Sequence, residues 1–198
     1  IFNRFQLNGI KFVQTWGGCV YHMTCRGSRR NTVDKAKNIY EDSPEWLAQN
    51  QRSTKNFIRK WGHFVKHDIF MKPIIPPKYD IGLIVKNGST QLLEVLEPWC
   101  STVYINDANG NQYTQYVEKE QPNTTIDLSE KIKPYDNEKN NEILVTIEGN
   151  IFNQQDFEYI QQLSEILANS GEIGSFELGN LHIDVIQINT YEKELIKL

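Results

Sequence analysis

One histidine and the basic residues after it have the types and spacing that bind anions. His22 lies in a run of β-forming residues, and a Gly/Ser turn with three arginines follows within eight residues. Guanidinium groups match phosphate oxygens in geometry, and turn amides add donors. His22, Arg26, Ser28, Arg29 and Arg30 are therefore candidates for a cradle that binds an oxyanion or a diphosphate. On spacing alone, a solvated basic loop beside a hydrogen-bonded histidine is favoured.

The same region contains residues that bind zinc in other proteins. Cys19, His22 and Cys25 are spaced three apart, but closed zinc sites need four ligands in paired spacings. In a strand, the two cysteines share one face and His22 points to the other. His63 and His67 are four residues apart, but a glycine just before them is predicted to end the preceding helix. The pattern argues against a structural zinc site.

Charge divides the chain into two unlike parts. Residues 1–78 hold 14 Lys and Arg against 5 Asp and Glu, a net charge of +9. Residues 79–198 hold 7 against 20, a net charge of −13, and the two values give the −4 of the whole chain. This asymmetry favours an anionic ligand for the basic part. Docking of the two parts on each other is the alternative.

Three short motifs carry a resemblance to a known family. The segment WGGCVYH at residues 16–22, followed by RGSR at 26–29, resembles the late region of family 2 glycosyltransferases with the GT-A fold. FIRKWG at 57–62 is similar to the F-x-x-K-W-G that often closes such a domain, and IFNRF at 1–5 is similar to the helix after the family's acidic pair. The resemblance covers roughly residues 1–65.

The resemblance implies a role for the cradle. In the family, the late histidine helps to bind the metal and the nucleotide diphosphate, and only His22 matches it here. The donor-diphosphate site is therefore expected to comprise His22, Arg26, Ser28, Arg29, Arg30, Lys60 and Trp61. His22 is also expected to coordinate a divalent metal ion, Mn or Mg. The partners implied are a nucleotide-sugar donor and a sugar or protein acceptor.

The resemblance also implies that catalysis needs more than this chain. The family's nucleotide-binding βαβ unit, its D-x-D metal motif and its general base are expected upstream of Ile1, a residue that is not an initiator methionine. The chain is then a C-terminal fragment of a hexosyltransferase-like enzyme, not catalytically complete alone. Residues 79–106 read as β-α-β, but they lack a Gly-rich phosphate loop, and Asp107 sits in an Asn/Gly turn. The second part is therefore not expected to complete the site.

The elements that must position these residues are predicted as an α/β fold. A basic segment of helix and short strand (residues 1–72, a partial GT-A-like tail) precedes a proline-rich linker at 73–78 and a small acidic α/β sandwich domain at 79–198. In the first part, a strand is expected at 19–25, then a basic loop and polar stretch to about residue 42. A helix follows from Pro44 to Gly62, with a capping serine before its proline.

The second part reads as alternating strands and helices. Strands are expected at 79–85, 102–106 and 143–148, and residues 112–118 are expected to pair with 102–106 as a hairpin. Helices are expected at 89–97, at 127–132 and from Asn153 to Gly171, and the rest of 119–141 as loop. A final hairpin is expected at 174–178 and 181–188. The sequence leaves the strand order open.

Composition limits the class of protein. The chain has no run of 18 apolar residues, and its three cysteines at irregular spacing suit a reducing compartment, so we expect a cytoplasmic protein without a membrane span. A non-enzymatic interaction module, in which the acidic domain binds a partner, is the alternative to the transferase. Nucleic-acid binding by basic and aromatic residues of 57–66 is disfavoured, because the acidic part would repel a polyanion.

Overall fold

The computed structural model describes residues 1–11, 13, 15, 17–18, 30–34, 39–106 and 111–196. The predicted strand at 19–25 and most of the basic loop after it lie outside the described residues. The first described element is a short helix, α1 (Phe2–Leu7). Residues 72–80, which contain the prolines of the predicted linker at 73–78, form no helix, as predicted. The division into domains at 73–78 stays a prediction.

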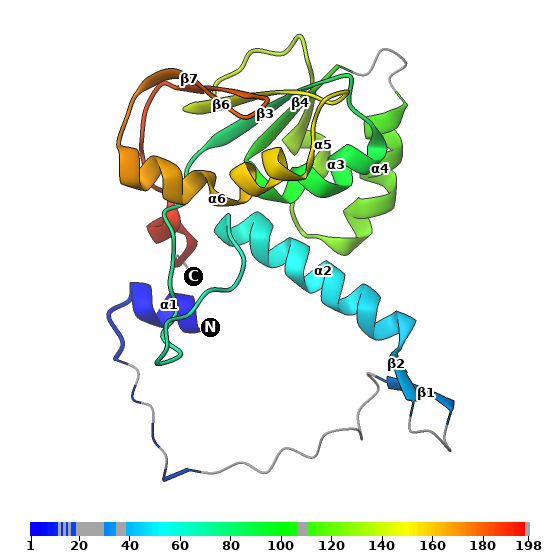
Figure 1. Ribbon diagram of the computed structural model, residues 1–198, viewed down its shortest axis with the longest axis vertical. Coiled ribbons are helices and arrows are strands. Elements are labelled where there is room, and N and C mark those ends of the chain that lie inside the picture. Colours follow the sequence, from blue (N-terminus) through cyan, green and yellow to red (C-terminus); the bar gives the residue numbers. More distant parts are fainter. Residues whose placement is uncertain are drawn as a thin grey trace.

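A β-hairpin lies where the sequence suggested only a polar loop. Strands β1 (Arg30–Asp34) and β2 (Ile39–Asp42) pair antiparallel, with a bulge near Asp34. Figure 1 shows this hairpin at the N-terminal end of the long helix α2 (Pro44–Trp61). The loop prediction was wrong because Thr, Val, Ile and Tyr residues in these strands favour extended backbone although charged residues surround them.

Six described strands form a mostly parallel sheet in the second part. Strands β5, β4, β3 and β6 lie side by side and parallel, in that order; β8 pairs antiparallel with β6, and β7 with β8. The bounds are β3 Ile81–Lys86, β4 Thr102–Ile105, β5 Ile132–Pro134, β6 Ile143–Glu148, β7 Gly174–Leu178 and β8 Leu181–Val185. The general α/β class and the final hairpin are confirmed. Strand β5 was missed, since it is only three residues long.

Helices connect these strands. The bounds are α3 Thr90–Leu96, η1 Glu97–Trp99, α4 Gln112–Glu120, η2 Gln121–Asn123, α5 Leu128–Lys131, α6 Gln154–Ser170 and η3 Glu192–Ile196. The predicted helices at 89–97, at 127–132 and after Asn153 are confirmed. None of the helices in the described ranges combines the length and the apolar character needed to cross a bilayer.

Helix α4 corrects the prediction of a strand at 112–118. Tyr, Thr and Val residues suggested a hairpin partner, but Tyr113, Tyr116, Val117 and Glu120 recur at the spacing of one helix face. Tyr116 is fully buried. The topology gives the physical reason, because β4 and β5 are parallel and a parallel pair needs a crossover rather than a tight turn.

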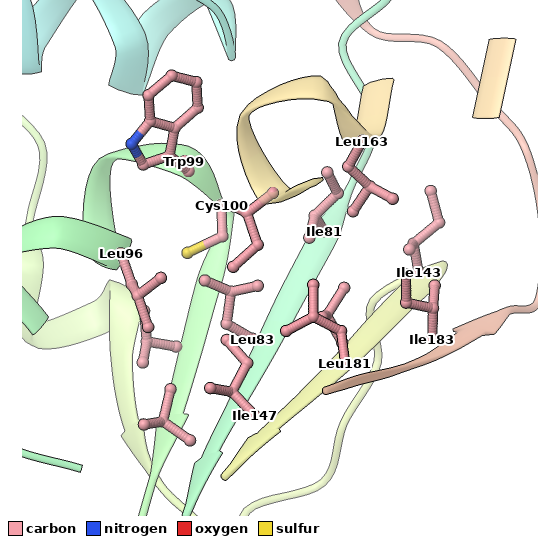
Figure 2. Packing of buried hydrophobic residues seen from close by; sticks show 14 of the residues in the cluster. Ile81, Leu83, Leu96, Trp99, Cys100, Ile143, Ile147, Leu163, Leu181 and Ile183 are labelled. Carbon is pink, nitrogen blue, oxygen red and sulfur yellow. The ribbon is translucent and has the colours of Figure 1, made fainter. Parts of the chain in front are cut away.

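The main core lies between one face of the sheet and helices α3 and α6. Leu83, Leu96, Leu163 and Ile183 are each at most 1% exposed, and Ile58 of α2 belongs to the same cluster. Figure 2 shows the strand and helix side chains meeting in this layer. The other face is more polar. There the Tyr104 hydroxyl donates to Asn141 Oδ1 at 2.9 Å, from the segment that precedes β6.

The backbone segments that follow β3 and β6 approach each other closely at Asn87 and Gly149. The Gly149 N–H donates to the Lys86 carbonyl at 2.8 Å, and Asn87 adopts a φ of 50°. A Cβ at position 149 would lie 2.3 Å from the Asn87 carbonyl oxygen, so the backbones could not keep this approach. The two adjacent strand ends therefore have a fixed separation.

We expect Gly149→Ala to lower the free energy of unfolding by about 2 kcal/mol, since backbone must move to relieve the overlap. Urea unfolding of the 198-residue chain measures this change. The neighbouring exposed Asn150→Ala serves as the control and is expected to stay within about 0.5 kcal/mol of the parent. Equal effects of the two substitutions would show that the close approach is not required.

Candidate functional site

The structure describes only some of the predicted site residues. His22, Arg26, Ser28 and Arg29 lie outside the described residues, and Arg30 is described only as the first residue of β1. The remaining two, Lys60 and Trp61, lie in the last turn of α2.

The ends of α2 place Lys60 and Trp61. The Ser43 side chain accepts a hydrogen bond from the Trp46 N–H at 3.3 Å, with proline next to it in the first turn. Gly62 ends the helix in the left-handed conformation, at φ 78°, and its N–H donates to the Ile58 carbonyl. These caps are the signals that predicted the helix, and they bring its last turn beside the segment that follows.

A pocket of about 720 Å³ opens beside this last turn. Its walls come from three parts of the chain: the start around α1, the end of α2, and the segment 65–73. Figure 1 shows that segment passing α1. The aromatic rings of Phe2, Phe57, Trp61 and Phe70 form much of the lining. Two segments singled out by the sequence, 1–5 and 57–62, thus meet at one pocket although more than 50 residues separate them.

Lysine side chains lie at and near the pocket. The Lys60 Nζ lies 5.7 Å from the Trp61 ring centroid, a cation–π geometry. Burial and the nearby positive charge of Arg4 lower the pKa of Lys60. Lys60 is not among the lining residues, whereas Lys66 and Lys72 are. Lys66 is paired with Glu165, and the described lining itself includes no carboxylate. The pocket can therefore hold a flat or apolar group beside an anionic one, and its described lining offers the imidazole of His67, but no carboxylate, as a base.

A metal site is not visible in this part of the molecule. In the described ranges, no three His, Cys, Asp or Glu side chains lie close enough together to hold an ion. His63 is buried and makes a 2.5 Å contact from Nδ1 to the Phe64 carbonyl; burial lowers its pKa, so its ring is neutral. His67 lies past the end of α2, as the glycine predicted. His22 as a metal ligand stays a prediction.

A buried network of charges fixes α2 against the sheet domain. The Arg59 guanidinium donates to Glu97 and Glu120 at 2.7 and 2.8 Å, and Lys131 Nζ donates to Glu97 at 2.7 Å. The Tyr116 hydroxyl donates to the same Glu97 carboxylate at 2.9 Å. The side chains of Arg59 and Glu97 are completely buried. Lys55 adds a third, partly exposed cation 3.5 Å from Glu120. Each buried carboxylate thus has cationic partners, which satisfies groups that would otherwise be costly to bury.

The network changes the acid–base behaviour of its members. Burial alone would raise the pKa of Glu97, but Lys131 and Arg59 outweigh it and hold the pKa at about 2. Burial opposes the charge of Arg59, yet Glu97 raises the pKa of the guanidinium above its usual value. Burial and the Glu97 charge raise the pKa of Tyr116, so its hydroxyl stays neutral and donates. All these groups hold one protonation state near neutral pH, as expected of a structural site.

The Lys78 side chain caps the C-terminal end of α2. Its Nζ donates to the carbonyls of Arg59 and Lys60, at 3.1 and 2.7 Å. These carbonyls are among those that a helix leaves without partners at its C-terminus. Burial, with a smaller effect of Lys131, lowers the pKa of Lys78 to about 8. Lys78 thus ties the end of the proline-rich segment to the turn that carries Lys60 and Trp61.

Sequence reasoning missed this network. The sequence marked Arg59 only as part of the family-like motif at 57–62, whereas its side chain is buried beside Ile58. One signal was available: Glu97 stands in the apolar run Leu96-Glu97-Pro98-Trp99, where a charge needs a partner. The identity of that partner, 38 residues away, has no local signature.

Comparison of the chain with protein-family models, with curated proteins and with solved structures gives no match. The pocket and its surroundings therefore carry the functional argument.

Proposed function

We propose that this chain is the C-terminal part of a metal-dependent family 2 glycosyltransferase of GT-A type, which transfers a hexose from a nucleotide-sugar donor to a sugar or protein acceptor. Residues 1–72 form the donor side, and residues 79–198 form an additional α/β domain. One observation carries the proposal: the family-like segments 1–5 and 57–62 line the same pocket. Segments that close one active site must come together in this way.

The chemistry of the pocket suits a nucleotide diphosphate. Aromatic rings such as Trp61 can stack on a flat base. Lys72 of the lining and Lys60 beside the Trp61 ring can attract phosphate charge, whereas Lys66 is paired with Glu165. The net charge of +9 in residues 1–78 has the same sign. Under the proposal, Arg26, Ser28, Arg29 and Arg30 contact the diphosphate. This is binding chemistry, and the carboxylate that deprotonates the acceptor belongs to the expected upstream part.

The metal requires ligands from both parts of the proposed enzyme. His22 is the one ligand that the family resemblance assigns to this chain, and the D-x-D motif upstream would supply the carboxylates. A divalent ion bound there would stabilise charge on the leaving diphosphate. The residues of this chain would orient the diphosphate through guanidinium and backbone N–H groups.

An exposed apolar surface supports a longer polypeptide. Among the described residues, 17 large hydrophobic side chains are exposed, and eleven of them lie at residues 1–10, 13 and 64–74, including Ile1, Val13 and Ile69. Soluble proteins rarely leave apolar side chains gathered in this way unless another surface covers them. Under the proposal, the upstream nucleotide-binding domain covers this surface and completes the pocket.

The test begins with the gene. Its reading frame is expected to continue upstream of Ile1 with a βαβ unit and a D-x-D motif. In the complete polypeptide, release of nucleoside diphosphate with Mn²⁺ should fall by about a hundredfold in kcat/KM when His22→Ala and Arg29→Ala are combined. The control is Arg52→Ala, an exposed arginine of α2 that does not line the pocket and should leave the rate unchanged.

Two results would overturn the proposal. One is an upstream sequence without the metal motif, and the other is equal donor affinity, by calorimetry with a nucleoside diphosphate and Mn²⁺, for the parent and the double variant. The circular dichroism spectrum of each variant verifies that a loss of activity is not a loss of fold.

A further inference from the structure

A second hollow lies at the carboxyl edge of the sheet, far in sequence from the proposed donor site. It has a volume of about 540 Å³ and lies where β3 and β6 end. After β3, the chain adds β4 and then β5 on one side of β3. It then returns to place β6 on the other side of β3, so the order of the strands reverses between β3 and β6. Ligands of open α/β sheets bind in the crevice at such a point.

The lining of this hollow is uncharged. Carboxamides of Asn87, Gln91, Asn150 and Gln154 surround it, and Phe152 and Phe157 supply apolar surface. Its described lining residues include no charged side chain, although residues 79–198 carry a net charge of −13. The side-chain amides of Gln91 and Asn150 make no hydrogen bond to any other described residue. Each carboxamide both donates and accepts hydrogen bonds, as a sugar hydroxyl does.

The helix ends at the hollow are already satisfied, which argues against an anion. Ser89 accepts the Leu92 N–H at 3.2 Å at the start of α3. At the start of α6, Asn153 accepts from the Gln155 and Asp156 N–H groups, and the buried Asp156 carboxylate accepts the Asn153 N–H at 3.0 Å. Asp156 thus already places a negative charge at this helix start, and a bound phosphate would meet repulsion there.

From this chemistry we propose that the hollow at the ends of β3 and β6 binds a neutral saccharide. Sugar hydroxyls would bond to the amides of Gln91 and Asn150, and the apolar face of the sugar ring would pack on the phenylalanines. The hollow has the volume of an ordinary ligand site. The close approach of Gly149 to the Asn87 carbonyl holds its two edges at a fixed distance. The proposal does not rest on the transferase function, because the described lining residues of this hollow all belong to residues 79–198.

Titration of the ¹⁵N-labelled chain with a panel of methyl hexosides, followed by NMR, tests the proposal. Amide shifts are expected to gather at residues 87–91 and 149–154 and to saturate. Combined Gln91→Ala and Asn150→Ala should weaken the binding of the best hexoside at least about tenfold, through the lost hydrogen bonds. The control is Gln115→Ala, an exposed carboxamide on α4 outside the hollow, which should bind as the parent does.

Three outcomes would overturn the proposal: no hexoside shifts these amides, sodium phosphate shifts them instead, or the double variant binds like the parent. The ¹⁵N spectrum of each variant establishes that it is folded. The titration contains no nucleotide and no metal, so its failure would leave the transferase proposal standing. Failure of the nucleoside diphosphate experiment would likewise leave saccharide binding standing.

Discussion

Replacing Glu97 with glutamine is expected to lower the free energy of unfolding by about 3–5 kcal/mol. The carboxylate is completely buried between Arg59 and Lys131, with nitrogen–oxygen distances of 2.7 Å to each. Its removal leaves two buried cations opposite the single carboxylate of Glu120, and an uncompensated buried charge is costly. Urea unfolding at neutral pH, followed by tryptophan fluorescence, measures the loss.

Glu94→Gln is the matched control for this substitution. Glu94 lies one turn earlier, on α3, and also pairs with a lysine, Lys119, whose side chain is 67% exposed. Exposed pairs contribute about 1 kcal/mol or less, so the control should lose no more than that. Similar losses in the two variants would mean that burial of the network does not stabilise the fold.

The contribution of Glu97 should disappear in acid. Its pKa is about 2 in the folded protein against 4.5 for the ordinary side chain, because Lys131 and Arg59 outweigh the effect of burial. A carboxylate with a depressed folded pKa stabilises the fold above the unfolded value, and this stability is lost as the pH falls from 4.5 through about 2. The amount lost is about 3 kcal/mol.

The difference in unfolding free energy between the parent and Glu97→Gln isolates this effect. It should be constant near neutral pH and then shrink by about 1.4 kcal/mol per pH unit below 4.5, because other carboxylates contribute equally to both proteins. Urea unfolding at a series of pH values between neutral and 3 measures the trend. A difference that stays unchanged across this range would contradict the low pKa of Glu97.

Much of the local structure could be predicted from the sequence. Ser43, Pro44 and Gly62 delimit α2, and Asn153 and Gly171 delimit α6, because capping requires particular side chains or a left-handed φ. The strands at 81–86 and 143–148 are apolar runs of strand length. Such signals are local in the chain, so they can be read without knowledge of the fold.

What depends on distant residues could not be predicted. Residues 112–120 have strand-like composition, and the helix is favoured there by burial of Tyr116 against α3 and by the parallel order of the strands. The pocket beside Trp61 needs the start of the chain to meet the segment after α2. The sequence singled out both segments, but nothing in either one indicates that they touch.

The charge network that joins α2 to the sheet domain limits where recombination between related genes can occur without loss of stability. Arg59 lies before the proline-rich segment, and its partners Glu97, Glu120 and Lys131 lie after it. Recombination within that segment, between genes with different residues at position 59, would give a hybrid with an unmatched buried charge. An exchange that joins the genes ahead of Ser43 keeps the four residues together. We therefore expect α2 and the sheet domain to pass between lineages as one module.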